Sequence, residues 1–140
     1  MHDETPVLSI CTTCRDGREA SDCLRGGVRL AQHILARNVE VTPGIVALRG
    51  VRCMSQCKRP CIASLCGHGR FTYVFGDLDP ERSDHVDALL ELVERYRTAP
   101  EGFLERQDRP EPLRANILGR LPPMNSASGL ITHLGTALVA

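Results

Sequence analysis

The 140-residue sequence has no excess of charge of either sign and no long apolar run. Its 17 basic and 17 acidic residues give a formal net charge of zero. A neutral chain lacks the electrostatic attraction that binds nucleic acid or anionic lipid, so we expect neither partner. No apolar run approaches the ~18 residues of a membrane span, and no basic, apolar leader opens the sequence. We therefore expect a cytoplasmic protein.

The motifs of the common enzyme classes are also missing. We find no glycine-rich phosphate loop, no Ser/His/Asp set and no paired carboxylates in a plausible pocket. We therefore do not expect an enzyme. The length suits one domain, and the sequence contains no internal repeat.

The sequence is rich in cysteine, with seven residues. Structural disulfides are rare in a reducing compartment, and an odd number of cysteines cannot pair completely. A single buried cysteine such as Cys66 can be a small core residue, but this does not explain clustering. The clustered cysteines are Cys11 and Cys14 after the first apolar run, and Cys53, Cys57 and Cys61 at four-residue intervals. Thiolates are soft ligands, so we predict a zinc or iron–sulfur centre.

Apolar periodicity predicts an α/β domain. Short β-branched runs predict strands, and helical spacing predicts two helices, the second opening at Pro80. We expect strands over residues 6–11, 45–48, 62–65 and 71–75, and helices over residues 23–37 and 80–97. The first strand, helix and second strand form a right-handed βαβ unit with parallel strands. The third and fourth strands form a hairpin around a glycine-rich turn. The order βαβ–ββα is that of a thioredoxin-like fold with a mixed sheet.

The composition changes after Ala99, where prolines become frequent. We expect a thioredoxin-like domain over residues 1–99 and a short proline-rich C-terminal extension over residues 100–140. The extension contains one short helical candidate, residues 113–121. We expect it to pack on the domain or on a dimer mate.

The topology also predicts where the cysteines meet. Both cysteine groups follow parallel strands, and the carboxyl ends of such strands lie at one edge of a sheet, where ligands usually bind. We expect residues 54–56 to offer backbone N–H groups to sulfur there. Arg15, Lys58 and Arg59 lie beside the cysteines and would favour a more negative, reduced centre. Gly26 and Gly27, in the first turn of the first predicted helix, would allow a close backbone approach.

Four of the cysteines, Cys11, Cys23, Cys53 and Cys57, form a spaced set. This set resembles the ligand pattern of the thioredoxin-like [2Fe–2S] ferredoxins. In that family two cysteines flank the first loop and a Cys-x3-Cys pair follows the second strand. The resemblance implies that these four thiolates hold a [2Fe–2S] cluster, and that the chain is a one-electron carrier with a redox partner protein and a homodimeric state. Cys14 could replace Cys11, and Cys61 could replace Cys53 or Cys57.

A second resemblance covers nearly the whole chain. Residues 11–15, 53–61, 72–80 and 121–123 are similar to the motifs of a bacterial family of predicted metal-binding proteins. That family has no settled function and is often associated with cobalamin biosynthesis loci. The resemblance implies a metal-binding protein and a link to cobalamin.

Two other interpretations remain open. A zinc- or cobalt-binding or metal-delivery protein linked to cobalamin would use the same cysteines with His33 or His68, although only Cys11-x2-Cys14 has the zinc-knuckle spacing. A thiol–disulfide oxidoreductase would use that same pair, but a polar loop follows it where a helix N-terminus should lower the thiol pKa. The acidic run over residues 77–87 complements a helix dipole, or else provides a docking patch for a basic redox partner.

Overall fold

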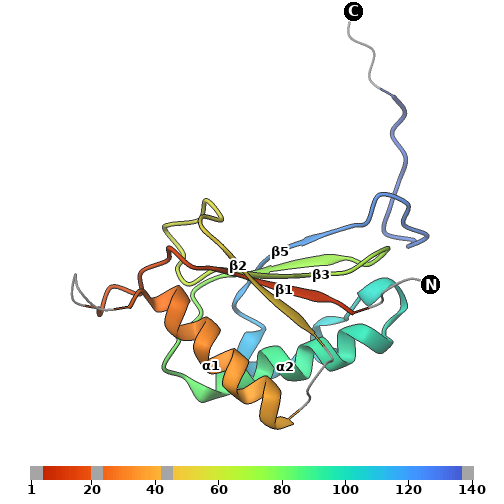
Figure 1. Cartoon of the computed structure of the whole chain (residues 1–140). Coiled ribbons are helices and arrows are strands. Elements are labelled where there is room, and N and C mark those ends of the chain that lie inside the picture. The colour runs from red at the N-terminus through yellow and green to blue at the C-terminus, as the bar shows by residue number, and fades with distance from the viewer. Residues whose placement is uncertain (1–4, 20–23, 42–45, 137–140) are drawn as a thin grey trace, which may run out of the picture.

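The protein is a five-stranded mixed sheet with two helices packed on one face, as Figure 1 shows. The computed structural model describes residues 5–19, 24–41 and 46–136. In the sheet order, β1 lies between β2, which is parallel to it, and β3, which is antiparallel, and β4 and β5 continue the antiparallel pairing. The strands are β1 (Val7–Cys11), β2 (Ala47–Val51), β3 (Ala63–Cys66), β4 (Thr72–Phe75) and β5 (Ile117–Leu121), and the helices are α1 (Gly26–Val41) and α2 (Ser83–Thr98).

The core lies between the sheet and the two helices. Side chains alternate across a strand, so one set from each central strand faces the helices. This set meets the apolar faces of α1 and α2, and the buried area makes it the main source of stability. Its fully buried members include Leu8, Ile10, Leu65, Tyr73 and Phe75 from the sheet, and Leu30, Ile34, Leu89 and Leu92 from the helices.

The predicted βαβ unit and hairpin are confirmed, with shifted boundaries. Helix α1 begins at Gly26 rather than at residue 23 and continues to Val41. Helix α2 begins at Ser83, because the chain first makes a turn after Pro80. In this turn the backbone N–H of Glu81 donates to the Asp79 carboxylate over 2.9 Å. The second strand was predicted over residues 45–48, and the structure has it as β2 over Ala47–Val51. Residue 45 lies outside the described residues.

The helix predicted over residues 113–121 is wrong, because residues 117–121 form strand β5. Strand β5 pairs antiparallel with β4, so that Tyr73 faces Arg120 across the ladder. The guanidinium of Arg120 also lies over the ring of Phe103, 4.4 Å from its centroid. An open sheet edge and these contacts outweigh the helical propensity of the sequence. Short 3₁₀ turns at Pro100–Gly102, Arg106–Asp108 and Glu111–Leu113 lead into this strand.

After β5 the chain runs away from the sheet (Figure 1). Met124 and Leu134 are almost fully exposed there. Of the helices in the described ranges, none combines the length and the apolar character needed to cross a membrane.

Candidate metal centre

The loops after β1 and β2 lie side by side, because the two strands are parallel and in register. Cys11 at the end of β1 is level with Val51 at the end of β2. The backbone N–H of Thr12 donates to the carbonyl of Val51 over 2.8 Å, and the hydroxyl of Thr13 donates to the carbonyl of Arg52. These bonds hold residues 12–14 against the start of the 52–61 loop.

A cavity of about 310 Å³ opens between the two loops, and we call it the cysteine hollow. Its thiol-bearing residues differ in depth, since Cys11 and Cys14 are buried whereas Cys53 and Cys57 are exposed. The other lining residues are Thr13, Arg15, Arg25, Ser55, Gln56 and Pro60. The hollow therefore carries two inner and two outer thiols.

Three of the four predicted ligands, Cys11, Cys53 and Cys57, line this hollow. The fourth, Cys23, lies outside the described residues. The alternate Cys14 also lines the hollow, whereas Cys61 is fully buried and does not. Across residues 5–19, 24–41 and 46–136, no group of three or more His, Cys, Asp or Glu residues is already arranged around a single ion position.

Cys66 lies apart from the other described cysteines. It pairs with Val7, at the opposite end of β1 from Cys11. Cys66 is only half-buried, so it is a residue of the sheet rather than the fully buried core cysteine that the sequence suggested.

Polar groups from both loops lie next to the sulfur atoms. The backbone N–H of Ser55 donates to the Sγ of Cys53 over 3.4 Å, and the Sγ of Cys11 lies 3.5 Å from the hydroxyl of Thr13. Ser55 adopts a left-handed conformation, with φ of 58°, so the loop turns back on Cys53. The expectation that this loop offers backbone N–H groups to sulfur is confirmed at Ser55.

The buried thiols differ in how readily they ionise. Burial raises the pKa of Cys11, but hydrogen bonds from Thr13, Cys14 and the backbone of Met54 outweigh it, so the net pKa is lowered. Burial, followed by the hydrogen bond with Cys11, raises the pKa of Cys14 to about 12. Burial likewise raises the pKa of Cys61 to about 12, with a further contribution from Cys14. Because a metal binds the thiolate, Cys11 is the most readily recruited of these three.

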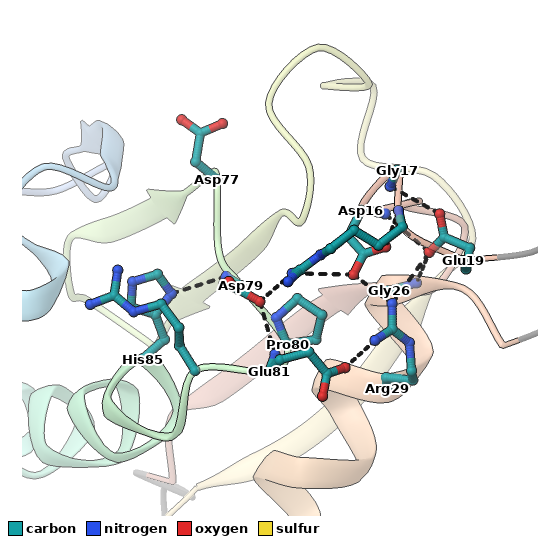
Figure 2. Close-up of polar contacts among 12 residues, drawn as sticks. Asp16, Gly17, Glu19, Gly26, Arg29, Asp77, Asp79, Pro80, Glu81 and His85 are labelled. Atoms are coloured by element: carbon teal, nitrogen blue, oxygen red, sulfur yellow. Dashed lines mark hydrogen bonds and ion pairs between the residues drawn. The ribbon is translucent and has the colours of Figure 1, made fainter.

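A buried polar network holds the loop that follows Cys14 (Figure 2). The Glu19 carboxylate accepts the backbone N–H groups of Asp16, Gly17 and Gly26 at 3.1, 3.0 and 2.9 Å. Arg29, in the second turn of α1, forms ion pairs with Asp16 at 2.5 Å and Glu19 at 3.5 Å. The two carboxylate side chains are only 5% and 2% exposed. Glu19 therefore joins the loop to the start of α1, across the segment that contains Cys23.

The same network reaches the start of α2. Arg29 also pairs with Glu81 (Figure 2). Arg18 pairs with Asp79. The backbone N–H of Asp79 in turn donates to Nδ1 of the buried His85 over 2.9 Å. Sequence reasoning did not find this network, because its members lie in loops where no periodicity brings them together.

Gly26 and Gly27 allow the helix to approach the cysteine loop closely, as expected. The N–H of Gly27 donates to the carbonyl of Cys14 over 3.0 Å. A Cβ on Gly27 would overlap the carbonyl oxygen of Cys11, and one on Gly26 would lie 3.0 Å from the Sγ of Cys61. No larger residue fits at position 27 without moving the backbone.

The two candidate histidine ligands lie away from the hollow. His33 lines a separate groove of about 510 Å³ between α1 and the start of α2, where its Nδ1 is 2.5 Å from the carbonyl oxygen of Pro80. His68 is exposed in the hairpin turn. The described part of the cysteine hollow thus offers sulfur ligands and no imidazole.

The acidic run that starts the α2 region is largely paired internally. Its five pairs are Asp77 with Arg59, Asp79 with Arg18, Glu81 with Arg29, Asp84 with Arg82, and Asp87 with Arg37. A carboxylate that already has an intramolecular cation attracts a basic partner less strongly. The pairing also directs Arg59 toward Asp77.

Comparison with known structures establishes the class of fold. The structure is similar to that of a thioredoxin-like [2Fe–2S] ferredoxin from Aquifex aeolicus, with a TM-score of 0.52 and 18% identity over 89% of this chain and 100% of that chain. A second structure, of the wild-type thioredoxin-like [2Fe–2S] ferredoxin from the same organism, gives a TM-score of 0.48 and 14% identity over 84% of this chain and 99% of that chain. The first similarity confirms the predicted thioredoxin-like fold.

The chain belongs to the family described as Protein of unknown function (DUF1636), which matches residues 8–123. No curated protein matches the chain. The expected membership of a family without a settled function is thereby confirmed, whereas the link to cobalamin stays a prediction.

Proposed function

We propose that the chain is a [2Fe–2S] electron carrier whose cluster is held in the cysteine hollow. The observation that carries this proposal is that two separate loops bring Cys11, Cys14, Cys53 and Cys57 to one cavity. Support also comes from the fold, which is similar to that of a solved thioredoxin-like [2Fe–2S] ferredoxin. Thiolate sulfur is the ligand that iron–sulfur clusters use, so the donor set fits the group.

Cys11, Cys53 and Cys57 would hold the cluster together with Cys23, and Cys14 is the nearest replacement. The cluster would supply outer-sphere transfer of one electron at a time. The chain's own groups set the conditions for this transfer: the N–H of Ser55 donates to sulfur, and Thr13 lies beside the Sγ of Cys11. Hydrogen bonds of this kind stabilise the more negative sulfur of a reduced centre and raise its potential.

A cysteine-ligated zinc or cobalt centre is the second candidate, and one observation favours it. Cys14 lines the hollow together with Cys11, so the described residues alone supply four thiols. Four thiolates satisfy a tetrahedral structural zinc site. A metal-delivery role linked to cobalamin belongs to this alternative.

The thiol–disulfide oxidoreductase interpretation is weaker. The pKa of Cys11 is lowered, whereas burial raises the pKa of Cys14 to about 12. A pair made of these two thiols would leave Cys53 and Cys57, which line the same hollow, without a role.

Metal analysis of protein purified without oxygen tests the proposal. We expect brown protein with equal amounts of iron and acid-labile sulfide, two of each per chain, as the formula of the cluster requires. Colourless protein with zinc, or blue-green protein with cobalt, and no sulfide in either case would establish the second candidate. Protein with neither metal nor sulfide, even after reconstitution with iron and sulfide, would exclude both.

A further inference from the structure

Four basic residues lie on the two loops that form the cysteine hollow or just before α1, and we call them the basic rim. Arg15 and Arg25 line the hollow. Arg52 directly precedes Cys53, and Lys58 directly follows Cys57. All four side chains are exposed.

The charges of the basic rim are not neutralised by carboxylates in the described part of the chain. No acidic residue lines the hollow there, and none of the described ion pairs involves a rim residue. Arg25 donates to the carbonyl of Thr13 over 2.9 Å, which leaves its charge in place. The neighbouring Arg18 and Arg59, by contrast, are paired with Asp79 and Asp77.

This rim makes the molecule electrically asymmetric. The formal net charge of the whole chain is zero, so four unpaired cations on one face leave the remainder of the chain negative by the same amount. An oxidised cluster with four thiolates is doubly negative, and a reduced one carries one more negative charge. Counted over the described residues, the four rim charges exceed both, so the described part of this face stays positive in either state. Local fields of this kind orient and speed the approach of an oppositely charged partner.

We propose that the basic rim is the docking face for an acidic protein. This inference deepens the proposed function, because the outer thiols Cys53 and Cys57 lie between rim residues and are exposed, so a partner bound here would sit next to the proposed electron-transfer site. The occupant is a protein surface rather than a nucleic acid, because four cations contact too few phosphates to hold a nucleic acid tightly at physiological salt.

The chain offers a specific chemical test, because Lys58 is its only lysine. A carbodiimide joins an amine to a carboxylate that touches it. With fluorescein-labelled poly-L-glutamate as the acidic probe, we expect cross-linking at Lys58 and binding that weakens several-fold between ~50 and ~200 mM salt. Lys58→Arg keeps the charge but lacks the amine, so it should bind the probe equally well and lose the cross-link.

Charge reversal completes the test. The double variant Arg52→Glu with Lys58→Glu should bind the probe at least ~10-fold more weakly, whereas Arg106→Glu, an exposed change outside the hollow, should bind it like the wild type. Equal weakening in both variants, or cross-links that avoid Lys58, would overturn the proposal. Tighter binding of a DNA duplex or of phosphatidylserine vesicles than of poly-L-glutamate would overturn it in favour of those partners.

The docking inference and the proposed function can fail separately. Probe binding is measured on the purified chain with its iron content determined in parallel. Iron and sulfide without probe binding would remove the acidic partner and leave the electron carrier. Probe binding to a chain that takes up no iron would leave the acidic partner and remove the electron carrier.

Discussion

At the scale of single residues, position rather than number separates the cysteines. Cys53 and Cys57 are exposed on the same loop, Cys11 is buried beneath them, and Cys66 lies at the far end of the sheet. The first three line the cysteine hollow, and Cys66 lies in the sheet away from it.

The cysteines therefore respond differently to substitution. Cys57→Ala should lower the iron content per chain by at least ~10-fold. Even the loss of a residue that only hydrogen-bonds to a metal ligand lowers metal affinity by about this factor. Cys66→Ala should keep the wild-type iron content and visible spectrum. Iron that survives the loss of Cys57, or that is lost equally in both variants, would contradict the proposed ligand set.

The buried His85 predicts how stability depends on pH. Burial lowers the pKa of His85 below its ordinary value of 6.5, and its Nδ1 accepts the N–H of Asp79. Below about pH 6.5 the unfolded chain therefore binds a proton that the folded chain does not. The free energy of unfolding should fall as the pH is lowered through this range, and level off once the folded imidazole also protonates.

Urea unfolding from pH 8 to pH 5 measures this contribution. In His85→Gln the side-chain oxygen can still accept the Asp79 N–H but does not titrate. Its pH dependence should accordingly be shallower than that of the wild type. Parallel curves for the two proteins would show that His85 is not the group responsible.

Residue-level sequence reasoning brought three of the four candidate ligands to one cavity, left Cys23 and the ligand set as predictions, and missed the residues that support the loops. Spacing placed Cys11, Cys53 and Cys57 together, because parallel strands end at one sheet edge. The Asp16–Glu19–Arg29 network has no such rule behind it. Its contacts depend on loop conformation, which the sequence pattern does not determine.

At the scale of elements, the start of α1 is fitted to the end of β1. Gly27 lies against the carbonyl of Cys11, with no room for a Cβ. Helix propensity alone predicts that Gly27→Ala adds up to ~1 kcal/mol of stability. Overpacking against a fixed backbone costs about 1–3 kcal/mol, so we expect the variant to be less stable than the wild type.

The matched control for Gly27→Ala is Gly119→Ala in β5, where nothing lies within 4 Å of an added Cβ. Thermal unfolding should show a lower Tm for Gly27→Ala and an unchanged or slightly higher Tm for Gly119→Ala. A higher Tm at position 27 would mean that the helix does not approach Cys11 as closely as described.

Local patterns predicted most elements and missed β5. The four strands and two helices that precede β5 carry clear periods, and only their ends moved. Residues 117–121 contain Leu118, Gly119 and Arg120 without strict alternation, and they become a strand because β4 presents an open edge. Pairing with a strand that is distant in the sequence leaves no signal in the local sequence pattern.

At the scale of the whole molecule, the chain after residue 99 contributes to the fold up to β5. Leu104 and Leu113 are 4% and 0% exposed, and each stabilises the fold by about 1.5–3 kcal/mol. Such amounts are a large share of the 5–15 kcal/mol that typically separates folded from unfolded protein.

Two shortened chains test this contribution. A chain ending at residue 123 retains β5 and should unfold within a few degrees of the full-length Tm. A chain ending at residue 99 loses both leucines and leaves the edge of β4 unpaired, so it should aggregate or lack a cooperative transition. A stable, cooperatively unfolding 1–99 chain would show that β5 is an accessory to the sheet.

The central claim is that the cysteine hollow holds a two-iron cluster. Electron paramagnetic resonance on anaerobically purified, dithionite-reduced protein tests it most directly, because a reduced [2Fe–2S] centre has one unpaired electron per two irons and zinc has none. The account predicts a signal that appears only on reduction, integrates to one spin per chain and disappears in Cys57→Ala. A protein that carries its full metal content and gives no such signal would contradict it.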